Sequence, residues 1–572
     1  MKKRFSKKQL ILFVGAILGA FIVRFLLIHL PGYERDIFWF KEWCFGAVNY
    51  GVTGIYANMW SDYPPGYFYI LKLISSVYKI FYPTLLEGTY FLQFLLKLPA
   101  ILADLGTATL IFFLIKEKYN FKIAYLALLA YAFNPAIFIN SAWWGQVDSI
   151  MVFVLLFSVS LLLKKKIKWS YILLAIACLI KIQAIIFIPL ILFITWRQKG
   201  LKAVIQGISS AMATVFVVLL PFIIKGNLQS VINVYLGAAN SYPFASMHAH
   251  NLWWLITNAQ GTSISDQMNL LGLGTYKTIG FFLFFLCYAI LLVYFRKKDW
   301  NKHRQDFYFG FAFLALCFFI LFTQMHERYI FPFFAFMILA FKNGYAKKVA
   351  YVIISLISVG TLLSSLSIAY PENTPTVAQF FELSPIITII FSIINLIIFI
   401  YLLIIVLKNI NKKTLLIILG IVMIITGGTY LKNKHSRLDL TELSPIKSSQ
   451  DWGTLHINKS VENNRLIVDK FIYFKGLGVH SNSEHQYHLN KKFKYFETDF
   501  GLDNESFCNN NARFIILGDN KILYDSGIIK HQSPKHIKVL VKDINILSLI
   551  TQDGGDGIDC DHTDWLNPVL IP

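Results

Sequence analysis

The chain has 572 residues, 56% of them hydrophobic, and its mean hydropathy of +0.56 is well above that of a soluble globular protein. Residues 441–572 carry 14 basic and 17 acidic side chains, a net charge of −3, so the first 440 residues carry a net charge of +24 against +21 for the whole chain. This positive charge falls in short runs between apolar segments. Such a pattern is typical of a polytopic membrane protein and argues against nucleic acid as a partner.

Apolar runs long enough to cross a bilayer recur along the first three quarters of the chain. The first, 9–30, is too long for the apolar core of a signal peptide and lacks a small-residue cleavage site, so we expect a retained helix. Placing the seven basic runs on the cytoplasmic side predicts further helices at 90–115, 122–140, 147–164, 203–224, 279–296, 307–323, 329–342, 347–369, 384–407 and 413–431.

Residues 169–196 are flanked by basic runs at both ends. A single helix cannot begin and end on one side of a membrane, so we expect two short helices that meet near Lys181 at the outer side. The fold class is then a polytopic α-helical membrane protein with about 13 membrane segments. Its N-terminus is expected inside the cell and its C-terminal domain outside. The apolar run 67–82 is expected to lie on the membrane surface, because a span there would move residues 116–122 to the wrong side.

Unusual polar side chains gather in the predicted external loops. "GYERDIFWFKEW" (32–43) places Asp36 at the start of an interfacial helix, where the simpler interpretation is a solvated charged face. "SDYPPGYFY" (61–69) adds Asp62 and Tyr63, and Asp62 could equally be a residue at the helix start. In "FNPAIFINSAWWGQVDS" (133–149), an aromatic belt explains the tryptophans, but it does not explain Gln146 and Asp148 at the entrance of a helix.

Three further segments complete this set. Lys181 and Gln183 lie at the turn between the two half-helices, where a lysine could also snorkel to the surface. "YPFASMHAHNLWW" (242–254) supplies His248, His250 and Asn251. The two histidines could ligate a metal, but the segment offers no third clear ligand, so we predict no metal site there. His326 and Arg328 belong to a "HER" motif at the outer end of a helix. Polar groups at such a place are costly in hydrocarbon and are usually functional.

The chemistry of these side chains suggests a phosphate site. Arg328 is permanently charged and offers a fork that suits phosphate, and Lys181 is a second cation expected at the same depth. An acid in the first external loop could act as a base toward a hydroxyl nucleophile. The cations could then stabilise a lipid phosphate as the leaving group.

The order of these motifs resembles that of the C-type membrane glycosyltransferases (GT-C). In particular, it is similar to the glucosyltransferases that extend lipid-linked oligosaccharides with dolichyl-phosphate-glucose. The matching elements are the acid after the first helix, "DYPP", "FNP", "WGQVD", "KIQ", "NLWW" and "HER", across residues 1–430. The resemblance implies a polyprenyl-phosphate sugar donor, an inverting displacement, no nucleotide donor and no bound cofactor.

The resemblance also implies roles for individual residues. The catalytic acid of the family corresponds by position to Asp36, with Glu34 as a rival because the local sequence departs from the family pattern. The donor phosphate is expected to bind Lys181, His326 and Arg328. The sugar or the acceptor is expected to bind Asp62, Tyr63, Gln146, Asp148, Gln183, His250 and Asn251.

The C-terminal region differs in pattern from the rest. Short alternating runs bounded by Gly, Asp and Asn predict a β-sandwich over 445–572, after a GT-C-like domain at 1–431 and a tether at 432–444. This region resembles the NPCBM carbohydrate-binding module. Its segment "DGGDGIDCDHTDW" (553–565) is either a turn-rich loop or a structural Ca²⁺ site. Cys508 and Cys560 lie in polar external loops, and we expect them to form a disulfide bond.

These features together predict a multi-pass cell-membrane glycosyltransferase. It would move a hexose from a polyprenyl phosphate to a cell-surface or lipid-linked glycan acceptor on the outer face, with membrane lipid around it. One alternative is a transporter or flippase of lipid-linked glycans, which would favour midplane charges and pseudo-symmetric halves. Another is a non-catalytic, membrane-anchored glycan-binding protein.

Overall fold

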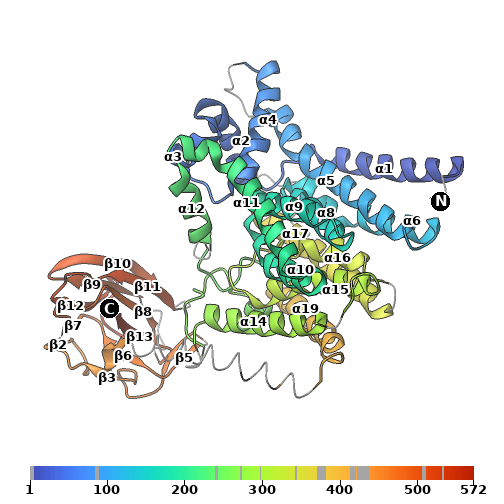
Figure 1. Cartoon of the computed structure of the whole chain (residues 1–572). Helices are drawn as coiled ribbons and strands as arrows, with labels where there is room; N and C mark the ends of the chain where they lie inside the picture. Colours follow the sequence, from blue (N-terminus) through green and yellow to red (C-terminus); the bar gives the residue numbers. More distant parts are fainter. Residues whose placement is uncertain are drawn as a thin grey trace. The chain divides into compact units, whose positions relative to one another are not determined.

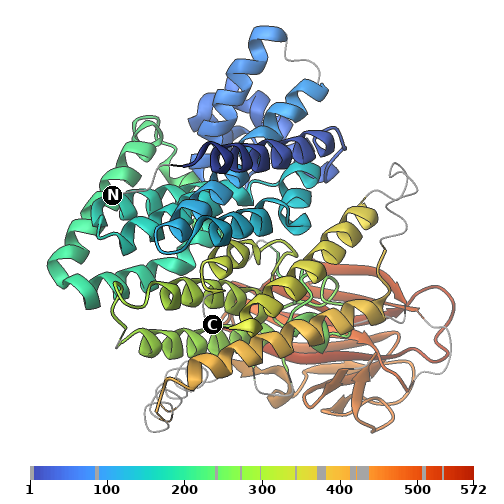
Figure 2. The same ribbon diagram turned by 90° about the vertical axis from the view of Figure 1, so that its right-hand side faces the viewer.

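The computed structural model describes residues 5–83, 89–238, 242–270, 274–296, 298–341, 344–369, 382–411, 416, 420, 437–469, 471–505, 511–530 and 534–572. The chain divides into two compact units (Figures 1 and 2). The helical unit comprises Met1–Tyr242, Met247–Ala259 and Cys287–Leu415. The carboxy-terminal unit comprises Pro243–Ser246, Gln260–Leu286 and Leu416–Pro572. A helical region followed by a β-sandwich domain confirms the coarse architecture predicted from the sequence.

The first half of the helical unit runs through α1 (Lys7–Leu27), α2 (Glu34–Asn49), α3 (Gly51–Asn58), α4 (Pro65–Phe81), α5 (Tyr90–Lys116), α6 (Phe121–Ala132), α7 (Pro135–Phe138), the π-helix η1 (Ile139–Trp144) and α8 (Asp148–Leu163). Next come α9 (Ile167–Ile180), the 3₁₀ helix η2 (Ile182–Phe187), α10 (Ile188–Lys199), α11 (Leu201–Ile224), α12 (Leu228–Gly237) and α13 (Leu252–Ile256). The remaining helices are α14 (Tyr276–Phe295), which is divided between the units, α15 (Arg304–Leu321), α16 (Phe331–Ile338), α17 (Tyr345–Ala369) and α19 (Pro385–Leu407).

Within the described residues, eight helices are long and apolar enough to cross a membrane, or nine if the bent α6–η1 pair is one span. Most helix boundaries up to residue 407 lie within about three residues of the predicted ones. The predicted span 122–140 is instead broken between α6 and α7, and the predicted span 329–342 contains only α16, Phe331–Ile338. The last predicted span, 413–431, lies outside the described residues apart from positions 416 and 420. The count of 13 segments and the assignment of sides therefore stay predictions.

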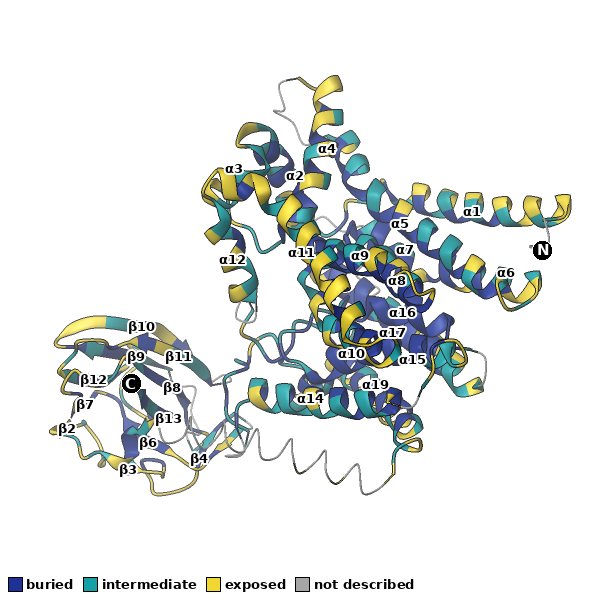
Figure 3. Cartoon of the chain, viewed as in Figure 1, coloured by how far each residue is buried: buried dark blue, intermediate teal, exposed yellow. Residues whose placement is uncertain are grey.

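Two helices show the surface expected of a membrane protein. On α11, the apolar side chains Ile205, Met212, Phe216 and Val217 are all exposed, and α1 exposes a similar apolar face (Figure 3). Helices α15 and α16 are instead buried over almost their whole length. An exposed apolar helix face is unfavourable in water and is suited to lipid.

Two breaks interrupt the apolar helices of this unit. Asn134 caps α7 and also donates to Tyr351 and Ser355 of α17, and the following Pro135 starts a segment bent by 44° from α6. Helix α9 ends at Ile180, because Lys181 takes an extended conformation before η2 begins. The expected break between two helices at Lys181 is therefore confirmed, whereas its place at the outer side of the membrane stays a prediction.

The sandwich contains two antiparallel sheets. One has the order β11-β8-β13-β6-β3, with β1 added beside β13, and the other has the order β10-β9-β12-β7-β2. A separate ribbon joins β4 and β5. The strands are β1 (Leu438–Asp439), β2 (Lys447–Ser449), β3 (His456–Ile457), β4 (Leu466–Val468), β5 (Phe471–Tyr473), β6 (Gly476–His480), β7 (Ser483–His488), β8 (Tyr495–Leu502), β9 (Asn511–Gly518), β10 (Lys521–Lys530), β11 (Lys535–Leu540), β12 (Ile546–Asp553) and β13 (His562–Ile571).

Apolar side chains from both sheets fill the space between them. Trp565 of β13 packs among Phe500 of β8 and Phe514 of β9, and all three are buried. Leu440 belongs to the same core, and Leu438 of β1 pairs with β13. The domain therefore begins before residue 445. This corrects the predicted boundary, because part of the expected tether packs as a strand and a core residue.

Candidate functional site

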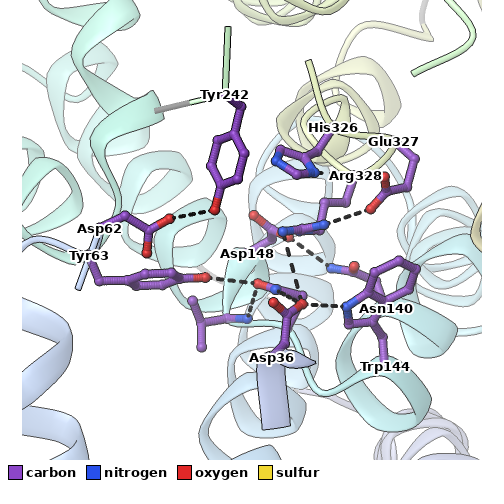
Figure 4. Close-up of polar contacts among 12 residues, drawn as sticks. Asp36, Asp62, Tyr63, Asn140, Trp144, Asp148, Tyr242, His326, Glu327 and Arg328 are labelled. Atoms are coloured by element: carbon purple, nitrogen blue, oxygen red, sulfur yellow. Dashed lines mark hydrogen bonds and ion pairs between the residues drawn. The ribbon is translucent and has the colours of Figure 1, made fainter. Parts of the chain in front are cut away.

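Polar side chains from four parts of the helical unit meet at one place (Figure 4). The first turn of α2, the bend between η1 and α8, the break after α9 and the segment between α15 and α16 each contribute. These elements are helix ends, where side chains can converge without interrupting the helical hydrogen bonds of the bundle. We call the following residues the polar cluster: Asp36, Gln146, Asp148, Lys181, Glu327 and Arg328.

Asp36 is held by several donors. Its Oδ2 accepts hydrogen bonds from Trp144 Nε1 (2.8 Å) and Gln146 Nε2, and Arg328 Nη2 lies 4.0 Å away. The Asp36 side chain is 21% exposed, so it remains accessible to a ligand. Glu34, the rival acid on the same helix turn, is exposed to solvent. The geometry therefore places Asp36 in the polar cluster as a fixed carboxylate.

Gln146 connects Asp36 to Lys181. Its Nε2 donates to Asp36, and its Oε1 accepts from Tyr63 OH (3.1 Å) and Lys181 Nζ (3.5 Å). The side chain is fully buried, and both ends of the amide are used. The amide orientation is thus determined by its partners, and it sets the distance between the carboxylate of Asp36 and the ammonium of Lys181.

Lys181 forms a buried ion pair with Asp148. Asn140 Nδ2 donates to the other oxygen of Asp148 at 3.2 Å. A buried charge is tolerated when it is paired and hydrogen bonded, and this arrangement meets both conditions. Lys181 is therefore present where the sequence suggested a cationic spot, but it already has an acidic partner.

Arg328 is likewise paired with a carboxylate. Its Nη1 donates to Glu327 Oε1 at 2.6 Å, and its guanidinium lies 5.5 Å from the Trp144 ring centroid. Its Nε is buried and has no hydrogen-bond partner among the described residues. An unsatisfied guanidinium N–H in a buried site is costly, and a phosphate oxygen would satisfy it.

Asp62 lies at the edge of the polar cluster. Tyr242 OH donates to Asp62 Oδ2 at 3.0 Å, and the Tyr242 ring packs edge-on against His326 at 5.1 Å. Tyr242 therefore links Asp62 to His326, which belongs to the same segment as Arg328. Tyr242 and Asn140 are contacts that the sequence alone did not identify, because both are ordinary residues of an aromatic loop and an apolar helix.

The remaining predicted residues have other surroundings. Asn251 caps α13 and donates to the carbonyls of Phe319 and Phe322. His250 Nδ1 lies 2.9 Å from Thr361 Oγ1, and the backbone carbonyl of His250 accepts from Asn395. Gln183 lies in η2, and its Oε1 is buried without a partner among the described residues. Within the part of the chain that the structure describes, no hydrogen bond joins these three side chains to the polar cluster, so their assignment to sugar or acceptor stays a prediction.

A buried lysine fixes the end of η1, where Trp144 lies. Lys97 Nζ donates to the carbonyls of Ile28 (3.2 Å), Leu30 (2.7 Å) and Trp143 (2.9 Å). Tyr33 stacks on Trp144 with ring centroids 4.7 Å apart. These contacts hold the donor indole in place beside Asp36.

The carboxylates of the polar cluster outnumber its cations. Asp36, Asp148 and Glu327 face Lys181 and Arg328, so a phosphate would bind only by sharing cations that already have partners. In the described residues, no group of three or more His, Cys, Asp or Glu side chains is arranged to hold a metal ion. The arrangement can hold a base beside two cations.

The acidic segment 553–565 begins at the end of β12, forms bends and a turn within 554–561, and continues into β13. Asp553 accepts from the backbone N–H of Gly555, and Asp556 accepts from Asn511. A calcium ion there stays a prediction. Cys560 is disulfide-bonded, whereas Cys508, the partner predicted for it, lies outside the described residues.

Comparison with known proteins identifies the carboxy-terminal domain. Residues 436–571 match the family model of the NPCBM/NEW2 domain. A similar solved structure is CBM51 from Clostridium perfringens GH95 in complex with methyl-galactose, with 31% identity, a TM-score of 0.23, and coverage of 23% of this chain and 99% of that chain. The M60 catalytic domain with CBM51-1 and CBM51-2 from Clostridium perfringens ZmpB is 34% identical, with a TM-score of 0.23 over 24% of this chain and 15% of that chain. No curated protein matches the chain.

Proposed function

We propose that the chain is a membrane-bound glycosyltransferase that takes a hexose from a polyprenyl-phosphate sugar. The acceptor would be a cell-surface or lipid-linked glycan at the outer face of the cell membrane. The observation that carries this proposal is the polar cluster, in which one amide, Gln146, joins the acid Asp36 to the cation Lys181. The order of motifs, which resembles that of the GT-C glycosyltransferases, supports the same assignment.

In the proposed reaction, Asp36 accepts the proton of the acceptor hydroxyl as its oxygen attacks the anomeric carbon of the donor. The bond between that carbon and the phosphate oxygen breaks, and its electron pair leaves with the polyprenyl phosphate. Arg328 and Lys181 stabilise the negative charge that grows on the departing phosphate. Attack opposite to the leaving group inverts the anomeric configuration.

The hydrogen bonds to Asp36 favour this role for geometric reasons. Trp144 and Gln146 both donate to Oδ2. These two hydrogen bonds orient the carboxylate, so the base need not reorganise when the acceptor binds. Such positioning of reacting groups contributes a large part of catalysis.

The NPCBM/NEW2 domain supports a glycan as the partner, because this module resembles carbohydrate-binding modules in sequence. A domain that holds part of the acceptor raises the effective concentration of the rest at the reaction site. The same domain also favours a second candidate, a membrane-anchored glycan-binding protein without catalytic activity.

The test is to incubate the purified chain with a panel of polyprenyl-phosphate hexoses and a glycan acceptor, and to measure free polyprenyl phosphate and glycosylated acceptor. We expect both products to form together with one donor of the panel, with inverted anomeric configuration. Acceptor binding without either product, across the panel, would support the non-catalytic candidate. Movement of intact donor across a vesicle membrane without cleavage would support a transporter.

A further inference from the structure

Three turns of the sandwich meet at one end of the domain. They join β7 to β8, β9 to β10 and β11 to β12, and they span residues 489–494, 519–520 and 541–545. The backbone N–H of Leu489 donates to the carbonyl of Asn545 at 2.7 Å. The carboxylate of Asp519 accepts from the backbone N–H of Ile546 at 2.9 Å. The three turns therefore contact one another and form one continuous surface.

This surface carries a group of unpaired cations. Five exposed lysines lie on the turns or directly beside them: Lys491, Lys492, Lys494, Lys521 and Lys542. The same turns contain two acidic residues, Asp519 and Asp543. Elsewhere in the domain Lys447 and Lys475 pair with carboxylates, whereas none of the five lysines forms an ion pair within the described residues. We call the surface defined by these five lysines the basic end.

The opposite end of the sandwich has the opposite charge. The loop between β8 and β9 (503–510) and the loop between β12 and β13 (554–561) together contain five acidic residues and no basic ones. The basic end therefore differs from the domain as a whole, which has more acidic than basic residues. A domain with its charges separated in this way is oriented by a charged surface nearby.

Exposed apolar side chains accompany the lysines. Leu540 is the last residue of β11 and is 55% exposed, and Ile522 near the start of β10 is 65% exposed. Leu540 lies opposite Tyr495 in the strand register, and Lys494 Nζ lies 5.3 Å from the centroid of the Tyr495 ring. Lysines next to exposed aliphatic and aromatic side chains are typical of surfaces that bind at a membrane interface.

The chain enters the domain at the basic end. Leu438 of β1 pairs with Leu570, and the carbonyl of the following residue, Ile571, accepts from the backbone N–H of Lys494 at 2.7 Å. The last predicted membrane span ends at residue 431, and an extended chain of seven residues reaches no further than about 25 Å. We therefore expect the basic end to lie nearer the bilayer than the acidic end.

We propose that the basic end docks on the anionic lipid headgroups of the membrane that anchors the chain. The five ammonium groups face the lipid phosphates, and Leu540 and Ile522 enter the headgroup region. Such attraction decreases with salt, because the Debye length falls from about 8 Å at physiological ionic strength to about 3 Å at 1 M. This inference goes beyond the proposed sugar transfer and does not depend on it.

The experiment uses the full chain in nanodiscs of phosphatidylcholine alone and in nanodiscs that also contain phosphatidylglycerol. An uncharged N-hydroxysuccinimide ester acetylates the lysines, and mass spectrometry measures the rate at each position. We expect the five lysines of the basic end to react at least about threefold more slowly in the anionic nanodiscs, and about 1 M sodium chloride to remove this difference. Lys530 is the matched control, since it is an exposed lysine at the other end of β10 and should react equally in both.

A triple variant tests whether the lysines act together. Lys491→Gln/Lys492→Gln/Lys494→Gln removes three charges from an exposed turn, so Lys521 and Lys542 should then react equally in the two lipids. The control Lys459→Gln/Lys530→Gln removes two exposed lysines that lie outside the basic end, and it should leave the protection of the five lysines unchanged.

Equal rates in the two lipids for the five wild-type lysines, or equal protection of Lys530, would overturn the proposal. A further arm adds soluble polyphosphate to the phosphatidylcholine nanodiscs. Protection by polyphosphate without protection by anionic lipid would replace the membrane with a soluble polyanion as the partner. No step of this test requires sugar transfer, so its result and that of the transfer assay are independent.

Discussion

At the scale of single residues, the structure shows which of the predicted polar residues contact one another. The sequence suggested Lys181 and Asp148 separately, but the ion pair between them joins positions 33 residues apart. The bond from Tyr242 to Asp62 joins positions 180 residues apart. Spacing along the chain carries no information about such contacts. The residue types and their place at helix ends were predictable, and their partners were not.

Arg328 is predicted to bind the donor phosphate. Arg328→Ala should raise the KM for the donor and lower kcat together, because the phosphate gains charge as the glycosidic bond breaks. Arg328→Lys should recover only part of the activity, since the guanidinium fork is lost. Steady-state kinetics at varied donor concentration provide the measurement. An unchanged KM and kcat in the alanine variant would remove Arg328 from the phosphate site.

Asp148 is predicted to compete with the donor phosphate for Lys181. Asp148→Asn keeps the shape of the side chain and removes its charge, so Lys181 becomes available to the donor phosphate. The donor KM should therefore fall by roughly threefold to tenfold, which corresponds to a free-energy change of at most about 1.4 kcal/mol. Asn140→Asp is the opposite control, because it adds a carboxylate 3.2 Å from Asp148 and should raise the donor KM. A higher KM in Asp148→Asn would show instead that Asp148 contacts the sugar directly.

At the scale of elements, charge patterning predicted the helix break at Lys181, and the structure confirms it. The bend after α6 lies inside the predicted helix 122–140, and the Asn134-Pro135 pair is the local signal for it. Helices α12 and α13 were not predicted, because the loop around them has no periodic apolar pattern longer than a few turns. The start of the sandwich was also placed too late, since β1 is only two residues long.

In the sandwich, β8 and β11 are joined by a pH-dependent pair. His536 lies opposite Asp499 in the register, and its Nδ1 is 2.7 Å from Asp499 Oδ1. Burial lowers the pKa of His536, but the hydrogen bond and the charge of Asp499 outweigh it and raise the pKa above its ordinary value of 6.5. Protonation therefore favours the folded state. The stabilisation is complete below pH 6.5 and is lost as the pH rises through the folded-state pKa.

We therefore expect amide protection in β8 and β11, corrected for the intrinsic exchange rate, to fall as the pH rises from about 6 to about 9. Hydrogen–deuterium exchange with mass spectrometry measures it strand by strand. His536→Gln should make the protection of these strands nearly independent of pH over this range. If wild type and His536→Gln lost protection equally, the pair would not be the cause.

At the scale of the whole molecule, the NPCBM/NEW2 domain and the proposed reaction site belong to different units and can be tested apart. If the domain holds part of the acceptor, an excess of a free glycan that binds the domain should raise the KM for a long glycan acceptor on the order of tenfold, and it should leave kcat and the KM for a short acceptor unchanged. Equal KM changes for long and short acceptors would contradict a holding role for the domain.

Asp36 is the proposed base of the sugar transfer. Its most direct test is the single-turnover rate of transfer from the active polyprenyl-phosphate sugar in wild type and Asp36→Asn, with donor affinity measured in the same samples. Glu34→Gln, on the exposed side of the same helix turn, is the matched control.

Asparagine has nearly the same shape as aspartate and can keep the contacts of Asp36, but its amide cannot accept the proton of the acceptor hydroxyl. We expect a rate roughly 10²–10⁴-fold lower in Asp36→Asn, nearly unchanged donor affinity, and a wild-type rate in Glu34→Gln. A wild-type rate in Asp36→Asn together with a lost rate in Glu34→Gln would contradict it.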